Sequence, residues 1–142
     1  MGRVSRSFGI LTAADVWTYG VRRMSQTILL SLGAAVNVPT GGAWTQLVAV
    51  MGNDAYGILV KMVNAAIAVE NAEVDLAIGV GGAEVEIVHG LQVALHRNGV
   101  ADIFENSREI YLPNVLIPAG ARLTARNRTG SANISVEIMG AG

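Results

Sequence analysis

The strongest constraint on the fold is a two-residue alternation of apolar and polar side chains, which recurs through residues 43–142. Between residues 73 and 79 the even positions are Val, Leu and Ile, and the odd positions before the closing glycine are Glu, Asp and Ala. The segments 84–88, 121–128 and 133–139 repeat this pattern. Successive side chains of a strand point to opposite faces of a sheet, so the alternation indicates strands with one buried face.

The spacing of these segments sets the expected fold class. Turn residues separate seven or eight short strands at intervals of roughly 10–15 residues, which is typical of a β-sandwich or a jelly roll. We therefore expect an all-β fold, a jelly-roll-like antiparallel β-sandwich. The Ala-rich segment 64–71 fits either a helical turn or a crossing loop. The clearest expected strands are residues 44–50, 56–63, 73–79, 84–88, 110–117, 121–128 and 133–139.

Residues 1–42 are expected to form an N-terminal extended arm and a linker. A weak capping box formed by Thr12 and Asp15 indicates a short helical turn within the arm. The apolar segment Ile28–Leu32 fits a short strand or a clasp. A proline and a pair of glycines close this part of the chain, as is typical of a linker. We therefore place the sandwich domain at residues 43–142.

The composition favours a protein that works within an assembly. Hydrophobic residues make up 51% of the chain and charged residues 15%, whereas an ordinary globular chain carries about 25% charged residues. So few charges cover the surface of a free monomer poorly, and we expect a symmetric oligomer, a homotrimer. Residues 1–69 and 111–142 are net basic and residues 70–110 are net acidic. This distribution fits either pairing between subunits or charges spread around a solvated sandwich.

Several classes of protein are excluded by simple features. The chain has no cysteine, which excludes disulfides, thiolate metal sites and cysteine nucleophiles. Its net charge of −1 gives no general attraction to nucleic acid or to anionic membranes. No apolar segment reaches the roughly 20 residues needed to span a bilayer, and the apolar run near the N-terminus is too short for a signal peptide. We expect neither nucleic acid nor a membrane as a partner.

No residue pattern indicates catalysis, a cofactor or a metal site. The glycine-rich segment before Glu84 lacks the third glycine of a dinucleotide fingerprint and leads into a strand, so it is predicted to be a hairpin turn. Glu84, Glu86 and His89 resemble a metal cluster, but on a regular strand the glutamates face one way and the histidine the other. Glu73 and Asp75 have the residue types of a glycosidase pair, yet carboxylates two apart on a strand are commonplace. We expect no enzyme.

Three arginines share one face of the expected strand 121–128 and are candidate partner contacts: Arg122, Arg126 and Arg128. An arginine ladder can bind carboxylates or phosphates in bidentate fashion. Alternatively, these side chains pair across strands with Glu137 on the following strand. The sequence leaves both interpretations open. No interleaved aromatic residues provide a stacking platform, which argues further against nucleic acid.

Two parts of the chain resemble structural proteins of tailed bacteriophages. Residues 11–19 (LTAADVWTY), with Arg22 following, are similar to a segment near the start of phage fibre and virion proteins, although the chain departs from that segment after Arg22. The segments 44–48, 74–79 and 111–126 are similar to a phage virion β-sandwich module with an IPAGTRL-type motif. Ala121 stands where that motif usually has threonine.

The resemblance implies a part of a virion. Our leading interpretation is a capsid decoration or cement protein, made in the host cytoplasm, that binds the major capsid protein or other virion subunits. The alternatives are a tail, neck or fibre component that uses the same module, and a glycan- or receptor-binding β-sandwich. In the arm, the candidate partner contacts are residue types that suit interface hot spots: Trp17, Tyr19, Arg22 and Arg23.

Overall fold

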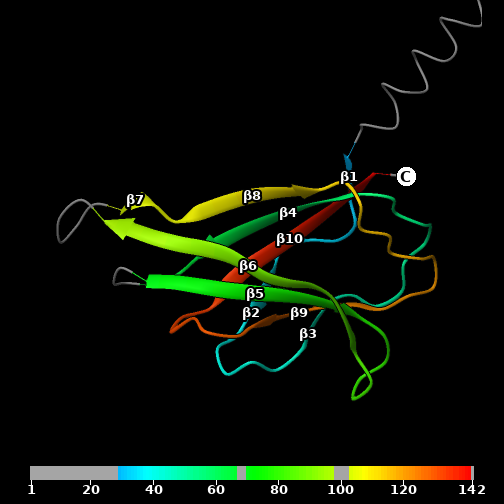
Figure 1. The fold of residues 1–142 in the computed structure, drawn as a ribbon, viewed down its shortest axis with the longest axis horizontal. Helices are drawn as coiled ribbons and strands as arrows, with labels where there is room; N and C mark the ends of the chain where they lie inside the picture. Colours follow the sequence, from blue (N-terminus) through cyan, green and yellow to red (C-terminus); the bar gives the residue numbers. More distant parts are fainter. Residues whose placement is uncertain (1–28, 67–69, 98–102, 142) are drawn as a thin grey trace, which may run out of the picture.

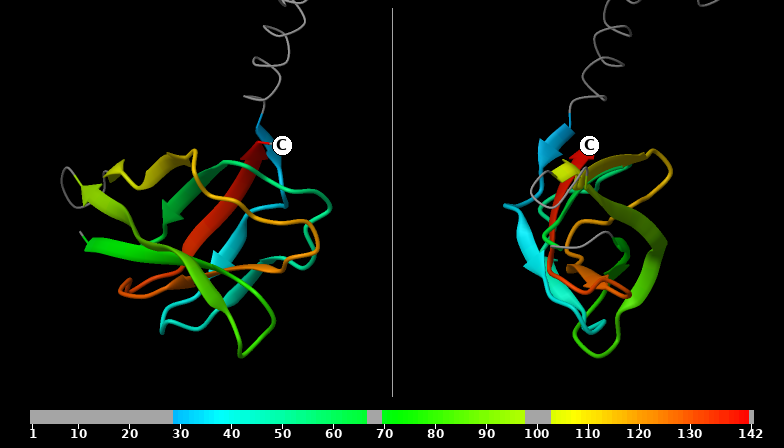
Figure 2. Two further views of the ribbon diagram at one scale, coloured as in Figure 1. Left: turned by 45° about the vertical axis from the view of Figure 1, so that its right-hand side comes forward. Right: turned by 90° about the vertical axis from the view of Figure 1, so that its left-hand side faces the viewer.

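The computed structural model describes residues 29–66, 70–97 and 103–141, and every regular element within them is a β-strand (Figure 1). The strands form two antiparallel five-stranded sheets that pack against each other (Figure 2). The predicted all-β antiparallel sandwich is therefore confirmed. None of the described residues belongs to a helix that could cross a membrane. The predicted helical turn and the four candidate contacts in the arm lie outside the described residues.

The first sheet is built around its C-terminal strand. Its order is β1-β10-β4-β8, and β2 pairs with the same edge of β10 as β1 does. Leu30 lies opposite Gly140 near one end of β10, and Val36 lies opposite Val136 nearer the other end. The strands are β1 (Leu29–Ser31), β2 (Val36–Val38), β4 (Ile58–Asn64), β8 (Ser107–Leu112) and β10 (Ile134–Ala141).

The second sheet has the order β3-β9-β5-β6-β7. Its long hairpin of β5 and β6 is irregular, because the register passes from Val74 opposite Leu91 to Leu76 opposite Val88 and then to Ala77 opposite Glu86. Each of these two steps adds one residue to β6, so the strand carries two β-bulges. The strands are β3 (Thr45–Val48), β5 (Glu70–Ile78), β6 (Val85–Arg97), β7 (Ile103–Glu105) and β9 (Leu123–Asn127).

The core between the sheets is aliphatic, as the alternation predicts. Ile134, Val136 and Ile138 of β10 are buried against Val74 and Leu76 of β5, within one hydrophobic cluster. Burying one such side chain contributes about 1.5–3 kcal/mol, so the inward faces of the strands account for much of the stability. On β5, however, the outward-facing side chain of Asp75 is also fully buried, which the alternation does not predict.

The sandwich begins earlier in the chain than we expected. β1 and β2 fall within the segment assigned to the arm, yet both pair with β10 because they supply backbone partners along one of its edges. Val38 is fully buried, and the amide of Leu32 donates to the carbonyl of Ile138 at 2.9 Å. Residues 39–44 form the connection from β2 to β3, with Gly41 at φ 99°. Residues 29–38 are thus part of the first sheet.

Three connections meet at one end of the sandwich, on the right in Figure 1: residues 49–57, 79–84 and 113–122. An isolated bridge joins Ala55 to Ile117, and the amide of Gly120 donates to the carbonyl of Met51 at 2.7 Å. The hairpin turn joins them through the amide of Gly79, which donates to the carbonyl of Arg122 at 3.1 Å. We call these three connections the loop end. The Ala-rich segment after β4 leads to the other sheet, and residues 67–69 lie outside the described part.

Candidate functional site

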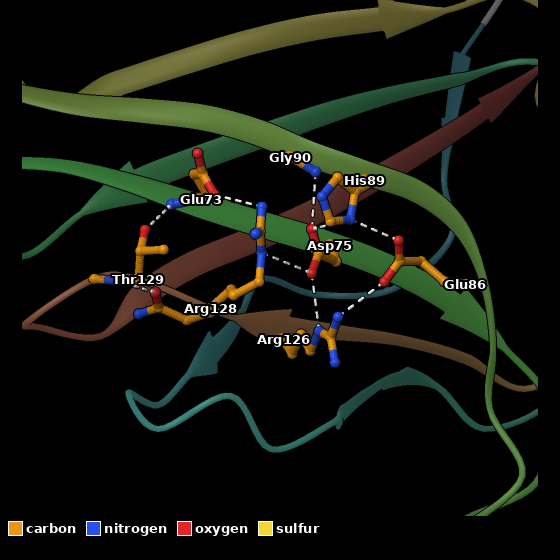
Figure 3. A network of polar contacts seen from close by, with 10 residues as sticks. Glu73, Asp75, Glu86, His89, Gly90, Arg126, Arg128 and Thr129 are labelled. Carbon is orange, nitrogen blue, oxygen red and sulfur yellow. Dashed lines mark hydrogen bonds and ion pairs between the residues drawn. The ribbon is translucent and has the colours of Figure 1, made fainter.

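The outer face of the second sheet carries a network of charged side chains from β5, β6 and β9 (Figure 3). Arg126 donates from Nε to Asp75 Oδ2 and from Nη2 to Glu86 Oε2, both at 2.9 Å. Arg128 pairs with Asp75, its Nε 3.3 Å from Oδ2, and its Nη2 also donates to Glu73. We call this set the charged network. Its members are Glu73, Asp75, Glu86, His89, Arg126 and Arg128.

Asp75 is the buried centre of the charged network. Its side chain is 0% exposed, and Oδ1 accepts a hydrogen bond from the Gly90 amide at 2.8 Å. Burial alone would raise the pKa of this carboxyl. The Gly90 amide and the guanidinium groups of Arg126 and Arg128 outweigh burial and hold the pKa of Asp75 below its usual value. The carboxylate is therefore ionised at neutral pH.

Arg122 forms a second group of contacts beside the loop end. Its Nη1 lies 3.1 Å from Glu84 Oε1, and its Nε donates to Gln46 Oε1 at 3.0 Å. The pKa of Glu84 is lowered by the backbone amide of Glu84 itself, and also by Arg122 and the Gly82 amide. These contacts connect the β5–β6 hairpin to β3 and to the start of β9.

An aromatic ring borders the charged network. The Arg126 guanidinium carbon lies 4.5 Å from the centroid of the Trp44 ring, which is the geometry of a cation–π contact. Trp44 is partly buried just before β3. The network is therefore bounded by an indole on the side where β3 forms the edge of the sheet.

The predicted pairing of the arginines with Glu137 is wrong. Glu137 belongs to β10 in the first sheet, where it lies opposite Lys61. The chain crosses from one sheet to the other between β9 and β10, so strands that are consecutive in sequence are not neighbours in space. Each of the three arginines on β9 and its flanks pairs instead with carboxylates of β5 and β6 or of the turn before β6: Glu73, Asp75, Glu84 and Glu86.

The expectation that His89 faces away from the glutamates is wrong for Glu86. His89 Nδ1 lies 2.7 Å from Glu86 Oε1, because the bulge between Glu86 and Val88 puts both side chains on the outer face. Glu84 is not part of this group. Sequence reasoning also missed the role of Asp75. The available signal was Gly90, since a glycine inside a strand pattern indicates a bulge, and its φ is 70°.

The arrangement is a largely self-satisfied charged surface on a rigid sheet. Three arginines and four carboxylates pair with one another within the chain, and the side chains of the arginines are 23–34% exposed. Such a surface can present charged groups to a partner in a fixed geometry without large rearrangement. Compared with protein-family models, with curated proteins and with solved structures, the chain matches none of them.

Proposed function

We propose that this chain is a structural protein of a tailed-phage particle, a decoration or cement protein that binds the capsid through its N-terminal arm and through the sandwich. The observation that carries the proposal is the order of the strands. The structure has the orders β1-β10-β4-β8 and β3-β9-β5-β6-β7, with β2 also paired to β10. We infer a jelly roll from these orders by giving β1 and β2 one position and setting the short β7 aside. The jelly roll is an architecture of viral capsid domains, so the strand order and the resemblance in sequence point in the same direction.

Exposed apolar side chains on the loop end support a docking role for it. Tyr56 and Leu116 are 63% and 52% exposed, and such residues close together on a surface are typical of interaction sites. Among the large apolar residues that are exposed in the described part, Val63 alone lies away from the loop end, near the far end of β4. The others are Val50, Tyr56, Val80, Val85, Tyr111 and Leu116.

The N-terminal arm joins the sandwich at this same end. β1 pairs with the last residues of β10, and a hollow beside it is lined by Leu32, Val50 and Met51 among others. The chain that leaves β1 and the loop end therefore contribute to one hollow. In the proposal, Trp17, Tyr19, Arg22 and Arg23 of the arm extend the contact that the loop end makes with a neighbouring virion subunit.

The arginines of the second sheet have a subsidiary role in this proposal. Arg122, Arg126 and Arg128 already pair with carboxylates of the chain, but each remains partly exposed. A partner carboxylate can therefore share them at the rim of an interface, where charges mainly affect association rate and salt dependence.

Binding to particles that lack this protein tests the proposal. The full chain is added to such particles, and occupancy is measured by co-sedimentation. Replacing an anchor in an interface costs more than about 1 kcal/mol, so Leu116→Ser should weaken binding by about tenfold. Val63→Ser is the matched control, because Val63 is also exposed but lies away from the loop end, and it should bind normally.

Two outcomes would contradict the decoration role. If Leu116→Ser and Val63→Ser bind as well as the unmodified chain, the loop end is not the docking surface. If the protein is found on the tail, neck or fibres and is absent from the head, the alternative within the virion class is correct.

A second candidate function, the binding of a glycan or a receptor, is favoured by Trp44. Its ring lies beside the charged network, and an aromatic face next to charged hydrogen-bonding groups suits a sugar ligand. Lectin domains also use jelly rolls. Glycan binding that is lost in Trp44→Ala, while occupancy on particles is unchanged, would favour this candidate.

A further inference from the structure

Three side chains with metal-binding atoms converge at the bulged part of β6. One ligand atom from each of Asp75, Glu86 and His89 lies within 4.8 Å of the other two. The imidazole Nδ1 is 2.7 Å from Glu86 Oε1 and 3.5 Å from Asp75 Oδ1. Figure 3 shows the three groups turned toward one another, Asp75 from β5 and Glu86 and His89 from β6.

The remaining contacts of the carboxylates hold this arrangement in place. Arg126 binds the other oxygens, Oδ2 of Asp75 and Oε2 of Glu86, so Oδ1 and Oε1 are the atoms that face His89. Carboxylates that bind metals are commonly fixed by such outer hydrogen bonds. Asp75 is fully buried while the His89 side chain is 60% exposed, so the group has a rigid base and is open to solvent.

The charges of this face leave room for a cation. Four carboxylates lie on it or on the turn before β6, against three guanidinium groups, so the face keeps an excess of negative charge when the imidazole is neutral. The arginines bind the outer oxygens and reduce this charge without cancelling it. A cation that displaces the His89–Glu86 hydrogen bond would therefore enter a face with net negative charge.

We propose that Asp75, Glu86 and His89 bind a divalent metal ion of the zinc class. Imidazole nitrogen combined with carboxylate oxygen suits zinc, whereas calcium and magnesium prefer oxygen ligands alone. Ligand atoms about 2.0–2.2 Å from a tetrahedral ion lie roughly 3.3–3.6 Å apart. The Asp75–His89 separation of 3.5 Å already fits, and the Glu86–His89 separation of 2.7 Å needs to open by less than about 1 Å. Water fills the fourth position.

The bulges are what create this site. On a regular strand His89 would face away from Glu86, and two of the three ligands would be on opposite sides of the sheet. The extra residues in β6 turn His89 to the outer face, and the Gly90 amide is positioned to bind Asp75. Bulges are over-represented next to functional sites because they redirect side chains in this way.

Titration of the full chain with zinc chloride in a calorimeter tests the proposal. We expect one zinc ion per chain, and binding at least tenfold weaker in His89→Gln and in Glu86→Gln. His96→Gln is the matched control, because His96 is the only other histidine of the chain, and it should bind zinc as the unmodified protein does. Circular dichroism of each variant establishes that the fold is retained.

Spectroscopy with cobalt in place of zinc provides a second measurement that does not depend on the stability of a variant. The unmodified chain should show the absorption of four-coordinate cobalt. In its nuclear magnetic resonance spectrum, the imidazole signals of His89 rather than those of His96 should be perturbed. Absence of binding at millimolar zinc would overturn the proposal. Equal loss of zinc binding in His89→Gln and His96→Gln, or unchanged zinc binding in Glu86→Gln, would also overturn it. Each of these results would mean that exposed histidines bind zinc without the carboxylates.

Discussion

Replacing Asp75 with alanine should lower the free energy of unfolding by about 3 kcal/mol. The carboxylate is fully buried and binds the Nε of Arg126 at 2.9 Å, Arg128 at 3.3 Å and the Gly90 amide at 2.8 Å. Removing one member of a buried ion pair costs roughly 3–5 kcal/mol, because the other charge loses its partner. The lower end applies here, since each guanidinium keeps a second carboxylate and the arginine side chains are 27% and 34% exposed.

A second substitution at the same position separates charge from volume. Asp75→Asn keeps the size of the side chain and an oxygen that can accept from Gly90, but it removes the charge. Its expected cost is about 2 kcal/mol, within the range for a hydrogen bond to a charged group. Glu109→Ala is the control, because the Lys61–Glu109 pair at 3.6 Å is exposed, and such pairs contribute about 1 kcal/mol at most.

Urea unfolding at neutral pH, with a chelator and at a fixed protein concentration, provides the measurement. Tryptophan fluorescence and far-ultraviolet circular dichroism should change together, and the slope of the free energy of unfolding against urea concentration should be the same for all variants. If Asp75→Ala loses no more stability than Glu109→Ala, the charged network does not stabilise the sheet. A gain in stability would mean that the cost of burying Asp75 exceeds the benefit of its pairs.

Further outcomes concern acid, the N-terminal strands, the bulge and self-association. Burial raises the pKa of Glu70, but the hydroxyl and amide of Ser131 outweigh burial and bring the pKa below 4.5. The stabilisation by these hydrogen bonds is therefore lost as the pH falls through the pKa of the folded state. Glu70→Gln should flatten that part of a curve of unfolding free energy against pH. In urea, deletion of residues 1–28 should leave cooperative unfolding, whereas deletion of 1–40 should abolish it because β1 and β2 are lost. Gly90→Val should cost about 1–3 kcal/mol in the same assay, since φ is 70° there, and should weaken zinc binding. Light scattering should give a trimer, and a monodisperse monomer at all concentrations would exclude it.

The strands themselves were predictable because their signal is local. In β10 the alternation of apolar and polar residues identifies Ile134, Val136 and Ile138 as inward, and all three are buried. The arginine face of β9 follows from the same argument. Each of these predictions needs only the two-residue period of a strand and one buried face.

Which strands are neighbours could not be predicted in the same way. The expected contact of the arginines with Glu137 assumed that consecutive strands pair, but the chain crosses between the sheets after β2, β3, β4, β7, β8 and β9. The segment before residue 43 was misassigned for a related reason. β1 and β2 have three residues each, too short for a periodic signal, and only the long edge of β10 makes them strands.

The candidate metal site shows the limit of the alternation most clearly. One extra residue in a strand moves every later side chain to the other face, so two bulges in β6 reverse the expected relation between Glu86 and His89 and then restore the regular pattern beyond Gly90. The core is unaffected, since Leu91 and Val93 are buried as a regular strand would have them. A local irregularity can thus alter the chemistry of the outer face while the packing of the inner face is retained. This explains why the sequence predicts the sandwich well and the charged network poorly, and why Gly90 rather than any charged residue is the position to change first.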